Sequence, residues 1–151
     1  MTQHIIQEDW ITNYLSYDDV INNRDVDPYA DSKFKPIRNM TSKRKGRFFE
    51  VLTEEYVEHL GMRVSKPENT DHDTVINGIK VEIKGSFRWV VDGVLTHYRW
   101  QQIRPSQDYE LMIFLALDPN KCEFYCGTKQ EISDFVTVED SNGNYTYNQH
   151  G

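Results

Sequence analysis

Residues 71–86, DHDTVINGIKVEIKGS, place several ionisable side chains around a tight turn. Asn77-Gly78 lies between alternating apolar residues, a pattern typical of a β-hairpin with a two-residue turn. Such a turn fixes the register of the two strands and sets Asp73 directly opposite Glu82. Residues opposite each other project from the same face of a sheet, so this register predicts two neighbouring carboxylates.

The two faces of this hairpin differ in chemistry. The face expected to pack on the core carries Thr74, Ile76, Ile79, Val81 and Ile83. The face expected to meet solvent carries Asp71, Asp73, Glu82 and Lys84, with Asp71 opposite Lys84 if the pairing continues that far.

Like charges directly opposite each other, with Cβ atoms roughly 4.5–5.5 Å apart, destabilise a hairpin. A divalent cation between Asp73 and Glu82 would turn this repulsion into ligation, because Mg²⁺ prefers carboxylate oxygens and keeps waters for a substrate phosphate. Lys84 lies on the same face, where its ammonium could contact a metal-bound water or a phosphate. The alternative is a solvated face on which Lys84 pairs with Glu82 or Asp71.

A helix is expected before the hairpin. Thr41 or Ser42 can cap its start, and Gly61 ends it after Leu60. Its predicted core stripe consists of Phe49, Leu52, Tyr56 and Leu60. Glu50 lies on the flank of this stripe, which is a costly place for an unpaired carboxylate.

The same helix begins inside a basic block. Residues 32–47 hold seven Lys or Arg and no acid, although the whole chain has a net charge of −7. Such a block can bind phosphates whatever the average charge of the protein. A solvated, flexible arm is the alternative interpretation.

Further strands are expected on either side of the hairpin, over residues 62–65, 87–91, 94–98 and 122–126. The run YELMIFLAL at 109–117 is the most apolar of the chain and is typical of a central strand buried on both faces. The polar segment WQQIRPSQ precedes it. Thr128 is expected to cap a helix that runs to about residue 135.

Composition excludes several classes of protein. No run approaches the roughly 18 apolar residues of a membrane span, so no membrane contact is expected. Cys122 and Cys126 share one face of a single strand and have no second Cys or His pair at zinc spacing, so neither a disulfide nor a zinc site is predicted. No Gly-rich phosphate loop appears, and no organic cofactor is expected.

Together these residues resemble the PD-(D/E)XK nuclease superfamily. Asp73, followed nine residues later by Glu82-Ile83-Lys84, matches its local pattern, with His72 in the place of the usual proline. The succession of elements over about residues 42–136 is also similar to the core of that family. The resemblance implies an α/β, restriction-endonuclease-like core, with a mixed central β-sheet flanked by helices.

The resemblance implies a role for each matching residue. Asp73 and Glu82 would ligate a metal, with the Ile83 carbonyl as a further oxygen and Glu50 as a direct or water-mediated ligand. Lys84 would orient the attacking water and stabilise charge on the phosphorane. Candidate accessory residues are Gln101, Gln102 and Asp71. Candidate nucleic-acid-binding residues are Lys43, Arg44, Lys45, Arg47, Arg88, Arg99 and Arg104, of which the last three could equally serve solubility alone.

The implied activity is Mg²⁺-dependent hydrolysis of phosphodiester bonds in DNA, with Mn²⁺ able to substitute. An endonuclease of phage, mobile-element or restriction type is expected. The alternatives are a Holliday-junction resolvase or exonuclease of the same fold, and a non-catalytic module that binds nucleic acid or protein. A homodimer is favoured, because cutting both strands needs two sites.

Three regions are expected along the chain. Residues 1–40 form an N-terminal extension, with a short helix over 5–15 and a linker, for dimerisation or DNA contact. Residues 41–137 form the nuclease core, and residues 138–151 form a loose polar tail. The expected location is the cytoplasm, or the host-cell cytoplasm if a phage encodes the chain.

Overall fold

The computed structural model describes residues 27–134, 138–139 and 145–150, with side chains over 27–134. The elements are α3 (Lys35–Arg38), α4 (Ser42–His59), β1 (Val64–Ser65), β2 (Thr74–Ile76), β3 (Ile79–Phe87), β4 (Val90–Val91), β5 (Val94–Leu95), β6 (His97–Ile103), β7 (Leu111–Leu117), β8 (Cys122–Thr128), α5 (Lys129–Ser133), β9 (Val138–Glu139) and β10 (Tyr145–His150). None of the helices in these residues is long and apolar enough to cross a membrane.

The central sheet is mixed and has five strands in the order β1-β2-β3-β7-β8. Only the β3–β7 pair is parallel, and the other three pairs are antiparallel. The β2–β3 hairpin pairs Thr74 with Val81 and Ile76 with Ile79, which confirms the predicted register. β7 is buried along almost its whole length, as expected for the central strand. The predicted fold class, an α/β core with a mixed central sheet flanked by helices, is confirmed.

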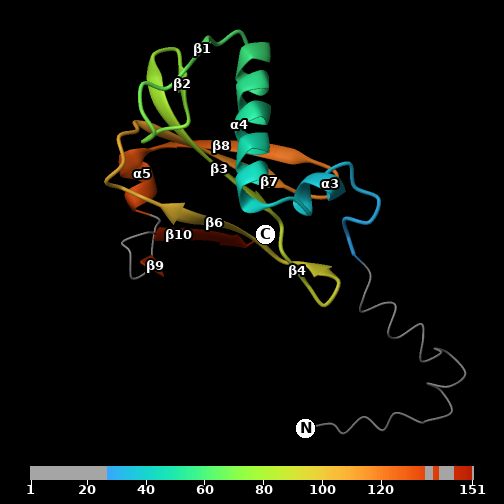
Figure 1. Ribbon diagram of the computed structural model, residues 1–151. Coiled ribbons are helices and arrows are strands. Elements are labelled where there is room, and N and C mark those ends of the chain that lie inside the picture. The colour runs from blue at the N-terminus through green and yellow to red at the C-terminus, as the bar shows by residue number, and fades with distance from the viewer. Residues whose placement is uncertain (1–26, 135–137, 140–144, 151) are drawn as a thin grey trace, which may run out of the picture.

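Helix α4 lies across one face of this sheet (Figure 1). Thr41 caps its start by accepting the N–H of Arg44, and Gly61 follows its end with a φ of 89°. The predicted core stripe is partly wrong, because the buried residues are Phe49, Thr53 and Val57, whereas Tyr56 and Leu60 are exposed. A threonine can occupy this apolar face because its hydroxyl donates to the Phe49 carbonyl, 2.7 Å away.

Helix α4 approaches β3 closely at Gly85. A Cβ atom built on Gly85 would lie 2.3 Å from ring carbons of Phe49, so the ring occupies the space of the missing side chain. Phe49 also packs with Val81, Ile83 and the β7 residues of the same core cluster. This contact fixes the height of α4 above the strand that carries Glu82 and Lys84.

A second layer covers the opposite face of the central sheet. There β6 pairs with β10, and β10 pairs with β9 (Figure 1). Trp100 is 1% exposed, and its indole N–H donates to the Leu115 carbonyl, 3.0 Å away. Residues 97–103 form one strand, whereas the sequence predicted a strand only as far as residue 98 and a polar segment from residue 100. The expected loose tail is also wrong for 138–139 and 145–150. Residues 145–150 pair with β6 and residues 138–139 pair with β10, and backbone pairing of this kind needs no apolar side chains.

The folded unit begins before the predicted boundary at residue 41. Tyr29 is fully buried, and its hydroxyl donates to the carbonyls of Arg88 and Leu117, at 2.9 and 3.2 Å. Its ring packs edge-on against Phe87. Arg38 of α3 lies 4.3 Å from the Tyr29 ring centroid, which ties α3 to this anchor. The predicted helix over 5–15 lies outside the described residues.

Candidate active site

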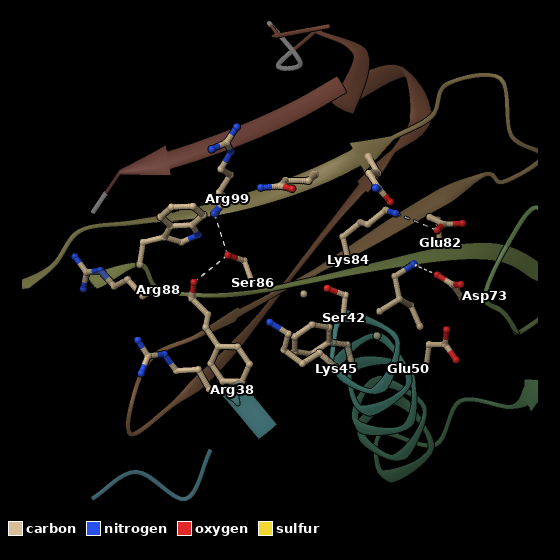
Figure 2. A pocket seen from close by; sticks show the side chains of 18 of the residues that line it. Arg38, Ser42, Lys45, Glu50, Asp73, Glu82, Lys84, Ser86, Arg88 and Arg99 are labelled. Carbon is tan, nitrogen blue, oxygen red and sulfur yellow. Dashed lines mark hydrogen bonds and ion pairs between the residues drawn. The ribbon is translucent and has the colours of Figure 1, made fainter. Parts of the chain in front are cut away.

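Glu82, Lys84 and Asp73 lie close together on the β2–β3 hairpin of the central sheet. Glu82 and Lys84 lie two residues apart on β3, and the Lys84 Nζ is 3.6 Å from Glu82 Oε1. Asp73 comes directly before β2, and its Oδ2 accepts the backbone N–H of Ile83 at 2.7 Å. Figure 2 shows this bond and the Lys84–Glu82 ion pair side by side. The structure thus brings the predicted pair of carboxylates together.

Glu82 is buried, with 6% of its surface exposed, although its face of the hairpin was expected to meet solvent. The reason is the second layer, because β6 lies over this part of β3, and the Arg99 N–H donates to Ser86 Oγ at 2.9 Å. The predicted set of core-facing hairpin residues is also partly wrong. Ile79 is 43% exposed, since it lies at the hairpin turn.

Burial and neighbouring charge perturb Glu82 strongly. Desolvation, followed by the negative charge of Asp73, raises the pKa of the Glu82 carboxyl from its usual 4.5 to about 8, against the opposing effect of Lys84. A carboxylate that resists ionisation beside another acid is typical of a functional site.

Glu50 approaches the same group from α4. Its side chain is 26% exposed and pairs with Arg47 across 3.0 Å. Burial raises the pKa of Glu50, Arg47 opposes the rise, and Asp73 adds to it. Glu50 therefore lies half-inside, as the helix periodicity predicted, and is electrostatically coupled to the hairpin.

These residues line one groove of about 680 Å³ between α4, β3 and β6 (Figure 2). The groove brings together most of the predicted site, namely Glu50, Asp73, Glu82, Ile83, Lys84, Gln101, Gln102, Lys45, Arg88 and Arg99. Its lining does not include Asp71, Lys43, Arg44, Arg47 or Arg104. Asp71 is exposed and precedes β2, so the strand pairing does not extend to it.

Arg38, Ser42 and Trp89 are among the groove-lining residues that sequence reasoning did not assign to the site. Arg38 belongs to the basic block, so the sequence could have suggested it as a phosphate-binding residue. Its ion pair with Asp27, at 3.0 Å, could not have been predicted because it depends on how residues 27–38 fold. Trp89 lies just before β4, and Arg99 lies 5.7 Å from the centroid of its indole. No sequence signal distinguished this tryptophan.

The groove has two chemically different ends. Glu50, Asp73 and Glu82 form an acidic end, whereas Arg38, Arg88 and Arg99 lie toward the other end (Figure 2). Arg88 is partly engaged, because its Nε donates to the Thr96 carbonyl at 3.2 Å. Such a groove can bind a cation through its acidic side chains and the phosphates of a nucleic-acid strand through its basic side chains.

The acidic end suits a hard divalent cation. Its donors are three carboxylates and the backbone carbonyl of Ile83. Burial, and to a lesser extent the negative charge of Asp73, raises the pKa of both Glu50 and Glu82. Within the described residues, however, no three His, Cys, Asp or Glu side chains are already arranged to hold a metal ion. Glu50 and Asp73 are turned to Arg47 and to the Ile83 N–H, so binding would require these side chains to reorient.

No protein-family model matches the chain, and no curated protein matches it either. Seven chains of solved structures do match. One is a bacterial homing endonuclease, I-Ssp6803I, with a TM-score of 0.51 and 17% sequence identity over 72% of this chain and 75% of that one. At this identity the likeness concerns the fold. The chain therefore shares the fold of a nuclease.

Proposed function

We propose that this protein is a Mg²⁺-dependent DNA endonuclease of the PD-(D/E)XK type. The observation that carries the proposal is the meeting of Asp73, Glu82 and Lys84 in one groove with Glu50. The fold shared with a homing endonuclease supports it. Because that neighbour cuts as an endonuclease, it also favours an endonuclease over an exonuclease for this chain.

Asp73 and Glu82 would hold the cation, together with the Ile83 carbonyl and Glu50. The cation would supply a hydroxide-like water and neutralise charge on the phosphate. Lys84 lies 3.6 Å from Glu82, close enough for its ammonium to hold the attacking water or a phosphate oxygen in place. The water oxygen would form a new bond to phosphorus and lose a proton, and the bond between phosphorus and the 3′ oxygen would break. The products would be a 5′-phosphate and a 3′-hydroxyl, whose oxygen takes up a proton.

Lys45 on α4, Arg88 directly after β3 and Arg99 on β6 would contact backbone phosphates on either side of the cut. They line the groove from opposite elements, so a strand lying in it passes between them. The acidic group lies at one end only, so each chain offers one site. We therefore propose a homodimer for cleavage of both strands.

The test is cleavage of supercoiled plasmid in Mg²⁺ or Mn²⁺ by the wild type and by Glu82→Ala and Lys84→Ala. Both variants should nick the plasmid at least about a hundredfold more slowly than the wild type. They should still bind DNA, and Lys43→Ala, outside the groove, should keep its activity. Absence of cleavage by the wild type on every DNA and RNA form would refute the proposal. Cleavage confined to a four-way junction would instead identify a resolvase.

A further inference from the structure

Strand β6 carries one more residue than its partner over the segment that faces the groove. Ile103 pairs with Tyr145 and Trp100 pairs with Tyr147, so a single residue of β10 lies opposite both Gln101 and Gln102. Gln102 has a φ of 56°, in the left-handed region. The two observations define a β-bulge at Gln101–Gln102.

The bulge redirects side chains. In a regular strand, residues three apart point to opposite faces, yet Trp100 and Ile103 are both 1% exposed in the same core cluster. The extra residue makes this possible and leaves Gln101 and Gln102 consecutively exposed between them. Both glutamines line the groove. A regular strand would have aimed only one of them there.

The conformation of Gln102 is unfavourable for its residue type. The other non-glycine residues with positive φ among the described residues are Asn77 and Asp92, which are short and occupy hairpin turns. Glycine would meet the requirement at Gln102 without strain. Strain retained beside a candidate active site points to a function for the amide.

We propose that Gln101 and Gln102 read the edges of the bases next to the cut phosphate, so that cleavage depends on DNA sequence at those positions. This inference rests on the proposed nuclease function. A glutamine amide matches the adenine edge in the major groove with one donor and one acceptor. A neutral amide adds little to phosphate binding, for which the groove already holds Lys45, Lys84 and Arg99.

The experiment is cleavage of a duplex library with a randomised segment, followed by sequencing of the cut ends. The full-length wild type is compared with Gln101→Ala, Gln102→Gly and the phosphate-contact control Lys45→Ala. We expect the wild type to prefer particular bases beside the cut. In each glutamine variant, the preference for one base over the others should fall about tenfold at one position beside the cut. Lys45→Ala should slow cleavage of all sequences alike.

Gln102→Gly tests the amide without disturbing the backbone, because glycine adopts the same φ freely. Its melting temperature should not fall, so a loss of preference cannot be ascribed to unfolding. Unchanged base preferences in both glutamine variants, with cleavage slowed equally on all sequences, would overturn the inference and assign the amides to the phosphate or metal instead. A wild type without base preference would overturn it as well.

A binding selection from the same library, with Ca²⁺ in place of Mg²⁺, separates this inference from the proposed function. If the wild type does not cleave, the nuclease proposal fails, and base enrichment in the bound pool still decides the glutamine inference. Enrichment lost in Gln102→Gly supports base reading. Equal enrichment in wild type and variants refutes it.

Discussion

The carboxylate of Asp73 accepts the backbone N–H of Ile83, with Oδ2 2.7 Å from that nitrogen. This bond joins the segment before β2 to the middle of β3, so it holds Asp73 beside Glu82 despite the repulsion between them. The Asp73 charge is among the causes that raise the pKa of Glu82. The two carboxylates are therefore placed by the backbone of the hairpin itself.

Replacing Asp73 by Asn should lower the pKa of Glu82. The amide oxygen of asparagine can still accept the Ile83 N–H, whereas the negative charge that opposes ionisation of Glu82 is gone. NMR titration of the carboxyl carbons in metal-free protein measures this change. Asp71→Asn is the control, because Asp71 is exposed outside the groove. A Glu82 pKa that stays near 8 in Asp73→Asn would show that burial alone sets it.

Glu82 should make the metal-free protein less stable as the pH rises. Its pKa is about 8 in the folded protein and about 4.5 when the chain unfolds, so between these values the folded state binds more protons. The free energy of unfolding should then fall as the pH rises from about 4.5 to 8. Glu82→Gln removes this proton linkage. It should melt several degrees above the wild type at about pH 9 in EDTA, and the difference should shrink toward about pH 5. The opposite trend would mean that Lys84 outweighs burial.

Mg²⁺ should stabilise the wild type if the proposed site holds it, because the ion would then bind the ionised carboxylates of the folded protein only. Protons compete with it for Glu82, so the rise in melting temperature at about 10 mM Mg²⁺ should be larger at about pH 8 than at about pH 5. Asp73→Asn should lose the rise, and Asp71→Asn should keep it. An equal effect of Mg²⁺ on all three proteins would indicate ionic strength rather than a site.

Gly85→Ala should destabilise the fold, because the new methyl group would lie 2.3 Å from ring carbons of Phe49. Relief of that overlap requires the Phe49 ring, or α4 with it, to move from β3, at a cost of about 1–3 kcal/mol. Gly46→Ala is a matched control on the same helix, since nothing lies within 4 Å of its Cβ. That variant should gain up to about 1 kcal/mol from helix propensity. Urea unfolding of both variants measures the two effects, and equal stabilities would contradict this close packing of α4 on β3.

Lys45→Ala should weaken DNA binding more than Lys43→Ala does. Both residues lie in the first turns of α4, but only Lys45 lines the groove. Loss of one phosphate contact should reduce the slope of log K against log salt by about 1. Fluorescence anisotropy of labelled duplex in Ca²⁺, at several salt concentrations, measures the slope. Identical slopes for the two variants would place the DNA away from this groove.

Local patterns predicted the elements that carry the acidic group. The Asn77-Gly78 turn fixed the hairpin register, and Thr41 and Gly61 marked the ends of α4, because turn and cap geometries depend on a few neighbouring residues. Helix periodicity also placed Glu50 correctly at the edge of the buried face. These features depend on residues close together in the chain, which is why one sequence was enough.

The second layer could not be predicted in the same way. Arg99, Gln101 and Gln102 make residues 99–103 look like a loop, and the full length of strand β6 is recognisable only once Trp100 packs on β7 and β10 pairs with it. The burial of Glu82 follows from that same layer. The bulge depends on pairing with residues more than about forty positions away, and no local pattern in β6 encodes such a partner.

The contact between Phe49 and Gly85 constrains the evolution of this fold. A homologue that keeps the phenyl ring has no room for a side chain at the other position, so the two positions should vary together. A bulkier residue on β3 would have to accompany a smaller one on α4. Since the acidic pattern of the hairpin is short and degenerate, this linked pair offers a second signature for finding distant relatives.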